Sequence, residues 1–137
     1  MSFVLDTSIT LAWVYAEETT KPVLDLFDVV RASGAWVPEL WLWEVANVLQ
    51  MNVRRGRHTG DFRDQSLFDL ALLPVQVDAE ASSQAWIETP RLAERHALTV
   101  YDASYLEIAR RREIPLATLD RELRAAALSD GVPLMGA

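Results

Sequence analysis

Cysteine is absent from this sequence of 137 residues, and histidine occurs only twice. Without cysteine the chain has no disulfide, no thiolate metal site and no cysteine nucleophile. Any metal ion must therefore be bound by carboxylates or by the two histidines. His58 lies in a polar turn and His96 at the end of a predicted helix, and we interpret both as surface residues rather than catalysts.

Long apolar runs are also missing, since none approaches the roughly 20 residues that a helix needs to cross a bilayer. The first residues, Met-Ser-Phe-Val-Leu-Asp, lack the basic region and cleavage site of a signal peptide. We therefore expect a cytoplasmic protein. Half of the residues are hydrophobic and no repeat or long linker divides the chain, so we expect one domain over residues 1–137.

Basic residues are few, with 13 Lys and Arg against 20 Asp and Glu and a net charge of -7. This balance argues against a broad nucleic-acid surface, which needs many basic contacts to phosphates. A nucleic-acid substrate would have to be bound locally, and two arginine clusters are candidates for this role. Solvated helix ends explain both clusters equally well. The clusters are Arg54, Arg55 and Arg57, and Arg110, Arg111 and Arg112.

Short apolar runs alternate with segments of helical periodicity. The runs that predict strands are residues 3–5, 35–38, 74–77, 115–119 and 132–135. The segments that predict helices are residues 22–32, 40–55, 61–73, 79–96 with a break near Pro90, 101–112 and 121–128. Strands separated by helices connect by crossovers, which favour parallel pairing. The sequence thus predicts an α/β fold, a three-layer α/β/α sandwich with a mostly parallel sheet of four to five strands.

Three aspartates stand where such a sheet collects ligands. Asp6 and Asp120 each end a predicted strand, and parallel strands bring both to the same edge. Asp102 follows the apolar stretch 98–100 and reaches a comparable level if that stretch lies beside the sheet. Each aspartate alone has a structural explanation, because all three precede helical sequence and Asp is a favoured N-cap.

Glu44 has no such explanation, because it lies inside a predicted helix. The face of the helix that carries Glu44 also carries Asn47, Val48 and Met51, so Glu44 should be partly buried. A buried carboxylate is costly unless it is paired or bound to metal, and a salt bridge to an arginine is the alternative to metal.

Convergence of these acidic residues would make an empty site unfavourable. At about 6 Å and an effective dielectric of about 20, each ionised pair repels by about 3 kcal/mol. Either protons or a divalent cation must then bind, and an all-oxygen site suits Mg²⁺ or Mn²⁺. Thr118 and Ser8 lie close to these acids in the sequence, and their hydroxyls could orient a ligand or serve as ordinary cap and turn groups.

Four stretches resemble the PIN domain of VapC toxins in order, spacing and apolar pattern, over almost the whole chain. They are Asp6-Thr7-Ser8 and residues 38–49, 101–107 and 115–123. Leu123 departs from the pattern, since many relatives have an aromatic residue there, and Glu122 is an extra acid without an assigned role.

The resemblance implies a metal-dependent endoribonuclease. The acidic quartet around Mg²⁺ or Mn²⁺ would be Asp6, Glu44, Asp102 and Asp120, supported by Thr118, Ser8 and Asn47. The resemblance also implies a homodimer and a VapB-like antitoxin whose segment covers the site and inserts an arginine among the carboxylates. The RNA target, whether transfer, ribosomal or messenger RNA, is not specified by the sequence.

Other functions fit the residues less well. A phosphatase of the haloacid dehalogenase type needs a second Asp where Ser8 stands. A response-regulator receiver needs an Asp after its third strand and a late-strand Lys, and the pattern offers neither clearly. The remaining alternative is a catalytically silent PIN module that serves as a protein-interaction domain.

Overall fold

The computed structural model describes residues 2–136. Five strands form one sheet in the order β3-β2-β1-β4-β5, and all neighbouring strands are parallel. The strands are β1 (Val4–Leu5), β2 (Ala35–Val37), β3 (Val75–Val77), β4 (Leu116–Ala117) and β5 (Leu134–Met135). The helices are α1 (Thr7–Val14), α2 (Lys21–Ser33), α3 (Leu40–Arg54), α4 (Gly60–Ala71), α5 (Ala79–Gln84), α6 (Glu88–His96), α7 (Val100–Arg112) and α8 (Arg121–Ser129), with a 3-10 turn at Ala16–Glu18.

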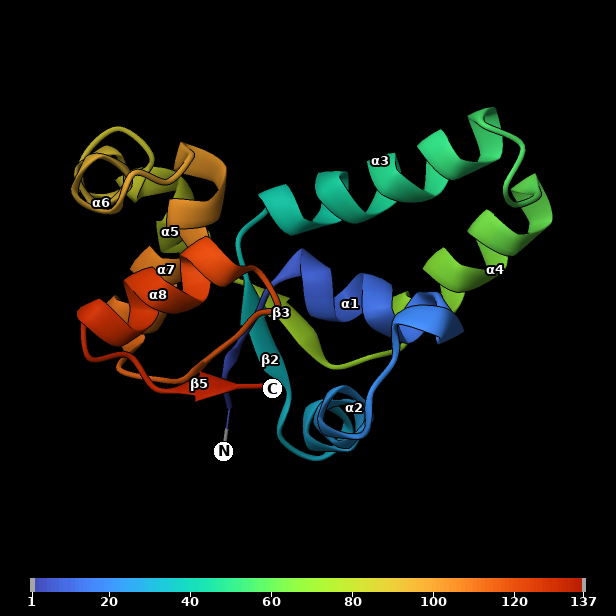
Figure 1. The fold of residues 1–137 in the computed structure, drawn as a ribbon, viewed down its shortest axis with the longest axis horizontal. Helices are drawn as coiled ribbons and strands as arrows, with labels where there is room; N and C mark the ends of the chain where they lie inside the picture. The colour runs from blue at the N-terminus through green and yellow to red at the C-terminus, as the bar shows by residue number, and fades with distance from the viewer. Residues whose placement is uncertain (1, 137) are drawn as a thin grey trace.

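Helices lie on both faces of the sheet. Figure 1 places α1 and α2 on one side of the strands and α7 and α8 on the other. The predicted three-layer α/β/α sandwich is therefore confirmed, and the sheet is parallel throughout the described residues. Among residues 2–136, no helix combines the length and the apolar character that a membrane span requires.

The middle of the sheet positions the candidate site. Phe3, Val4 and Leu5 are fully buried, as are both residues of β4. In the register between the strands, Val4 pairs with Leu116 and Leu5 with Ala117. The residues that follow the two strands, Asp6 and Thr118, therefore emerge side by side.

One local prediction is wrong. The helical segment 79–96 breaks between Gln84 and Glu88 rather than near Pro90. Pro90 is the third residue of α6, and N–H groups in a first helical turn have no partner within the helix, so a proline there breaks no bond. The apolar stretch 98–100 leads into α7, which begins at Val100, and Thr99 caps this helix by accepting a hydrogen bond from the Asp102 amide at 3.1 Å.

The interpretation of His96 as a surface residue is also wrong, and His58 is only partly exposed. The side chain of His96 is only 8% exposed, and its Nε2 lies 3.1 Å from a carboxylate oxygen of Asp130. His58 is half-buried, with its ring stacked on those of Tyr15 and Phe62. Both histidines pack against neighbouring elements, which the local polarity of the sequence did not indicate.

Candidate active site

Asp6 ends β1 with its carboxylate buried. Only 5% of the residue is exposed, and its Oδ2 accepts hydrogen bonds from Ser8 Oγ at 2.6 Å and Thr118 Oγ1 at 2.7 Å. Although Asp6 occupies the N-cap position of α1, its side chain makes no capping bond. Burial raises the pKa of Asp6, the two hydroxyl donors lower it, and the charge of Glu44 raises it further. Capping therefore does not account for this carboxylate.

Thr118 connects the ends of the two central strands. It is fully buried, and while its hydroxyl donates to Asp6 it also accepts a hydrogen bond from the Asp120 amide at 3.0 Å. Ser8 adds a parallel link, since its Oγ accepts from the Leu119 amide at 2.9 Å. Both hydroxyls that the sequence singled out thus hold the chain after β4 against Asp6.

Glu44 enters the same region from α3. Its Oε1 accepts hydrogen bonds from Thr7 Oγ1 at 2.9 Å and from the Tyr105 hydroxyl at 2.6 Å. No ion pair joins Glu44 to an arginine within residues 2–136, so the salt-bridge alternative does not apply there. Burial, followed by the charges of Asp6 and Glu44, raises the pKa of Tyr105, which keeps its hydroxyl protonated as a donor.

The roles of Thr7 and Tyr105 were not predicted from the sequence. Both residues lie in the stretches that carry the resemblance, and Tyr105 stands three residues after Asp102 on α7, so that the two share a helix face. Their common acceptor is far away in the chain, however, at separations of 37 and 61 residues. Only the folded structure brings these groups together.

Asp102 lies in the first turn of α7. Burial raises the pKa of Asp102 to about 6, and the charges of Asp6, Asp120 and Glu44 raise it as well. These repulsions mean that the four acidic groups share one region, at the carboxyl ends of β1 and β4. The order of the strands predicted only that Asp6 and Asp120 would lie at one edge, whereas the place of Asp102 was conditional and the quartet as a whole was implied by the resemblance.

Asp120 is the one aspartate of the group that does cap a helix. Its Oδ1 accepts a hydrogen bond from the Leu123 amide at 2.8 Å, and no donor to its other oxygen occurs among the described residues. Asn47, the third predicted supporting residue, is exposed on α3, and its side chain makes no hydrogen bond with the rest of residues 2–136. The structure therefore joins Thr118 and Ser8 to the acidic group but not Asn47.

The donor chemistry of this group suits a hard divalent cation. All four side chains offer oxygen, and their mutual repulsion is not offset by a paired Lys or Arg within the described part of the chain. Within the same residues, no three acidic or histidine side chains are gathered closely enough to form a metal-binding cluster by themselves. Because Mg²⁺ commonly binds one or two carboxylates and keeps several waters, its chemistry does not require such a cluster.

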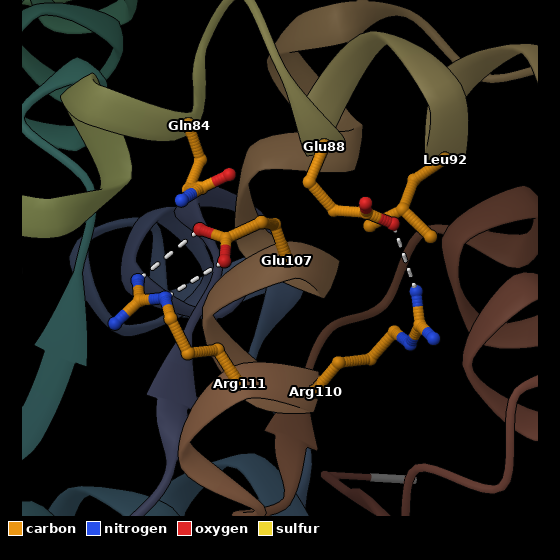
Figure 2. Close-up of a pocket in the computed structure, with 6 residues that line it drawn as sticks. All are labelled: Gln84, Glu88, Leu92, Glu107, Arg110 and Arg111. Carbon is orange, nitrogen blue, oxygen red and sulfur yellow. Dashed lines mark hydrogen bonds and ion pairs between the residues drawn. The ribbon is translucent and has the colours of Figure 1, made fainter.

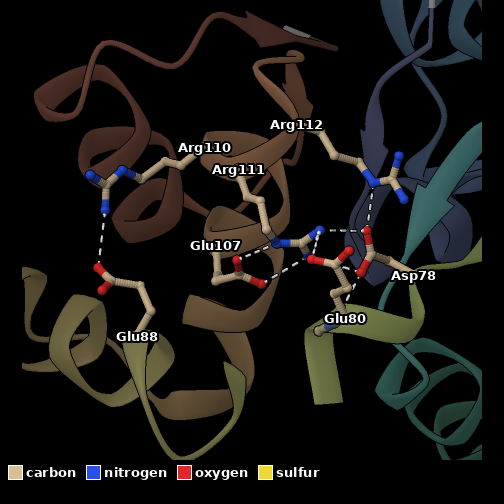
Figure 3. Close-up of polar contacts among 8 residues, drawn as sticks. Asp78, Glu80, Glu88, Glu107, Arg110, Arg111 and Arg112 are labelled. Atoms are coloured by element: carbon tan, nitrogen blue, oxygen red, sulfur yellow. Dashed lines mark hydrogen bonds and ion pairs between the residues drawn. The ribbon is translucent and has the colours of Figure 1, made fainter. Parts of the chain in front are cut away.

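The arginine cluster at residues 110–112 is occupied by ion pairs. Arg111 contacts Asp78 at 2.8 Å and Glu107 at 2.8 Å, Arg112 contacts Asp78, and Arg110 contacts Glu88 at 3.5 Å (Figure 3). Asp78 and Glu107 are buried, at 1% and 3% exposure. Arg110 and Arg112 are exposed at the end of α7, but all three arginines are paired with carboxylates, so the cluster is not a free site for phosphate.

A hollow of about 410 Å³ lies along the same part of α7. Its walls include Glu88, Glu107, Arg110 and Arg111, whose charges are paired with one another across it (Figure 2). None of the four acidic residues of the candidate site lines this hollow. We therefore assign it to the packing of α6 against α7 rather than to the site.

The second arginine cluster, Arg54, Arg55 and Arg57, is exposed at the end of α3. Arg54 follows Glu44 by ten residues, which corresponds to about 15 Å along a helix. These arginines thus remain candidates for contacts with nucleic acid outside the acidic site.

Comparison with known proteins gives consistent matches. The family model described as PIN domain matches residues 3–128. Ribonuclease VapC3 of Pyrobaculum aerophilum is 33% identical over 127 residues, which cover 90% of this chain and 92% of that protein. The crystal structure of PAE2754 from Pyrobaculum aerophilum has a TM-score of 0.70 and 27% identity, over 92% of this chain and 84% of its own. VapBC2 from Rickettsia felis, solved bound to a promoter DNA fragment, has a TM-score of 0.60 at 12% identity, over 98% and 97% of the two chains.

Proposed function

This chain belongs to the PIN-domain family, and on that basis we propose that it is a VapC-like toxin, an endoribonuclease that hydrolyses RNA phosphodiester bonds with Mg²⁺ or Mn²⁺. The observation that carries the proposal is the meeting of Asp6, Glu44, Asp102 and Asp120 at one edge of the sheet. The 33% identity to a protein named as a ribonuclease supports the choice of RNA as substrate.

The four acidic side chains are the residues that would hold the metal. When bound, a divalent cation lowers the pKa of water and stabilises negative charge on a phosphate. Thr118 and Ser8 orient the Asp6 carboxylate through their hydroxyls, and Thr7 and Tyr105 orient Glu44. Asn47, which is exposed one helical turn beyond Glu44, orients none of these carboxylates, and we assign it a direct contact with the substrate.

Hydrolysis by water at this site yields 5′-phosphate and 3′-hydroxyl ends. The chain provides no free histidine pair for an attack by the ribose 2′-hydroxyl, since His96 packs beside Asp130 and His58 stacks between two rings. The carboxylates instead repel a phosphate until positive charge is bound among them, which makes the reaction depend on the cation.

The partners that we propose are a second copy of this chain and a VapB-like antitoxin. The antitoxin segment would cover the acidic site and place an arginine among the carboxylates. Large exposed apolar side chains offer contact area for such partners, including Trp86 at 95% and Phe68 at 63% exposure. Light scattering on the isolated chain and co-purification with the product of a neighbouring gene test the two contacts separately.

The first prediction concerns Asp6. We expect Asp6→Asn to abolish RNA cleavage that depends on Mn²⁺ and is inhibited by EDTA, because the amide removes a buried negative charge from the metal site. Cleaved ends of total RNA, mapped after expression of each protein, give both the substrate and the chemistry. Circular dichroism checks that the variant remains folded.

The matched control is Asp28→Asn, which changes an exposed aspartate of α2 outside the site and should retain full activity. Equal cleavage by wild type and Asp6→Asn would refute the proposal. If the wild type itself cleaves no RNA with either cation, the chain is a catalytically silent interaction module.

A further inference from the structure

A cavity of about 220 Å³ lies between the first turns of α3 and α7. Helices α5 and α6 supply its other walls. The lining residues on which the inference rests are Leu40, Ser82, Ala85, Thr89, Tyr101 and Ser104. No charge pair fills this cavity, in contrast to the hollow on the other part of α7.

The cavity adjoins the acidic site through two helices. Tyr101 directly precedes Asp102 on α7, and Leu40 stands one helical turn before Glu44 on α3. Each of the two helices thus carries both a wall of the cavity and an acidic residue of the site.

The walls combine apolar surface with a few hydroxyl groups and one acidic side chain, that of the exposed Glu39. Tyr101 is 62% exposed, so much of its ring is free for contact. Thr89 is 1% exposed, and its Oγ1 has no hydrogen-bond partner among residues 2–136, which is costly for a buried polar atom. Ser82 and Ser104 add two more hydroxyls to the lining. Pockets with apolar walls and a few placed polar groups are typical of sites for small planar ligands.

We propose that this cavity binds an unstacked nucleobase of single-stranded RNA, beside the phosphate held at the acidic site, with Tyr101 as the stacking surface. The inference rests on the proposed function and specifies the form of its substrate. The volume is about seven times the ~30 Å³ that one water occupies in the liquid, enough for one base and too small for a helix of a partner protein. Stacking on an aromatic ring tolerates every base, which suits recognition without a basic surface.

The test measures binding of a short single-stranded RNA to the full chain, with Ca²⁺ present and intact RNA verified on a gel. We expect Tyr101→Ala to weaken binding by roughly 5- to 100-fold, the effect of losing one stacked base, and Tyr101→Phe to bind within about twofold of the wild type. Replacing the nucleotides one at a time by abasic residues should reveal one position whose loss weakens wild-type binding by the same factor. The same abasic replacement should not weaken RNA binding by Tyr101→Ala any further.

Two adjacent serines of α5 provide a test and its control, because a larger side chain would fill the cavity at one position and not at the other. Ser82 lines it, whereas Ser83 is exposed on the same helix and does not. We expect Ser82→Leu to weaken RNA binding and to raise the KM of cleavage, and Ser83→Leu to change neither. Circular dichroism of both variants separates a filled cavity from a damaged fold.

Each contrary result has a distinct meaning. Unchanged RNA binding in Tyr101→Ala and Ser82→Leu, with cleavage by the wild type intact, overturns the nucleobase site and leaves the proposed function standing. Unchanged RNA binding combined with weaker binding of a co-purified antitoxin overturns it in favour of a protein contact. If the wild type cleaves no RNA, the proposed function fails, and the abasic series still decides whether the cavity takes a base.

Discussion

The buried hydroxyl of Thr118 joins two of the acidic residues, donating to Asp6 and accepting from the Asp120 amide. Thr118→Val keeps the shape of the side chain but removes both hydrogen bonds. We expect cleavage or metal affinity to fall by about 10- to 100-fold, as is usual when a group that orients a metal ligand is lost. Thr118→Ser should recover most of the activity. A Mn²⁺ titration of the three proteins measures this effect, and equal affinities would show that the hydroxyl only stabilises the turn.

The raised pKa of Asp102 means that its ionised form destabilises the folded protein. Its folded pKa of about 6 lies above the ordinary value of 3.8, so its contribution to stability is complete below 3.8 and is lost as the pH rises through 6. In EDTA at about pH 7.5, Asp102→Asn should therefore raise the free energy of unfolding, by about 1 kcal/mol once solvent screening is allowed for. Urea unfolding measures the change.

The pH dependence distinguishes this cause from better packing of the amide. At about pH 4 the folded wild type already holds the proton on Asp102, so the advantage of Asp102→Asn should shrink. Asp28→Asn, at an exposed position, should show no gain at either pH. An advantage that is the same at both pH values would contradict the raised pKa of Asp102, which burial and the neighbouring carboxylates cause together.

At the scale of elements, Asp78 connects α5 to α7 through hydrogen bonds and ion pairs. Its Oδ1 caps α5 by accepting from the Ala81 amide at 2.9 Å, and its carboxylate binds Arg111 and Arg112 of α7. The guanidinium of Arg112 also lies 3.5 Å from the ring centroid of Trp36 on β2. This contact set holds the start of α5 against α7 and the sheet, and so fixes two walls of the 220 Å³ cavity.

We expect Asp78→Ala to destabilise the protein by about 3 kcal/mol, because the substitution removes the buried partner of Arg112, one of the two buried partners of Arg111 and the cap of α5. Burial alone would raise the pKa of Asp78, but hydrogen bonds and charge from Arg111 and Arg112 lower it overall. The stabilisation should therefore be present above the ordinary carboxyl pKa and be lost as the pH falls through the lowered value. Asp64→Ala removes an exposed ion pair with Arg63 and should have no measurable effect. Equal urea midpoints for the wild type and Asp78→Ala would contradict this role.

The sequence predicted the strands and most helices because their signals are local: apolar runs for strands, and periodicity for helices. It failed where a contact across the fold decides the outcome. The break before α6 lies between Gln84 and Glu88, while Pro90 is accommodated in the first turn of that helix. The arginines at residues 110–112 were interpreted either as a local contact for nucleic acid or as a solvated helix end, and neither interpretation included their acidic partners, which lie up to 34 residues away in the chain. The meeting of Asp6 and Asp120 was predictable because the ends of parallel strands lie at the same edge of a sheet, whereas the donors to Glu44 were not.

At the scale of the whole molecule, the fold gathers negative charge from four separate segments in a protein whose net charge is already -7. Folding without a cation therefore brings carboxylates together against their repulsion. Exposed carboxylates elsewhere on the surface are spread out and screened by solvent and salt. Binding of a divalent cation to the folded state should consequently be linked to stability.

We expect Mn²⁺ in EDTA-free buffer to raise the melting temperature of the wild type by several degrees. At a free concentration about 100 times the dissociation constant, the gain is about 2.7 kcal/mol if the unfolded chain does not bind the ion. The shift should be absent in Asp6→Asn, which lacks a ligand, and retained in Asp28→Asn. Potassium chloride at matched ionic strength controls for screening and should give little change. Equal shifts in the wild type and Asp6→Asn would place the bound cation elsewhere and separate the acidic group from metal binding.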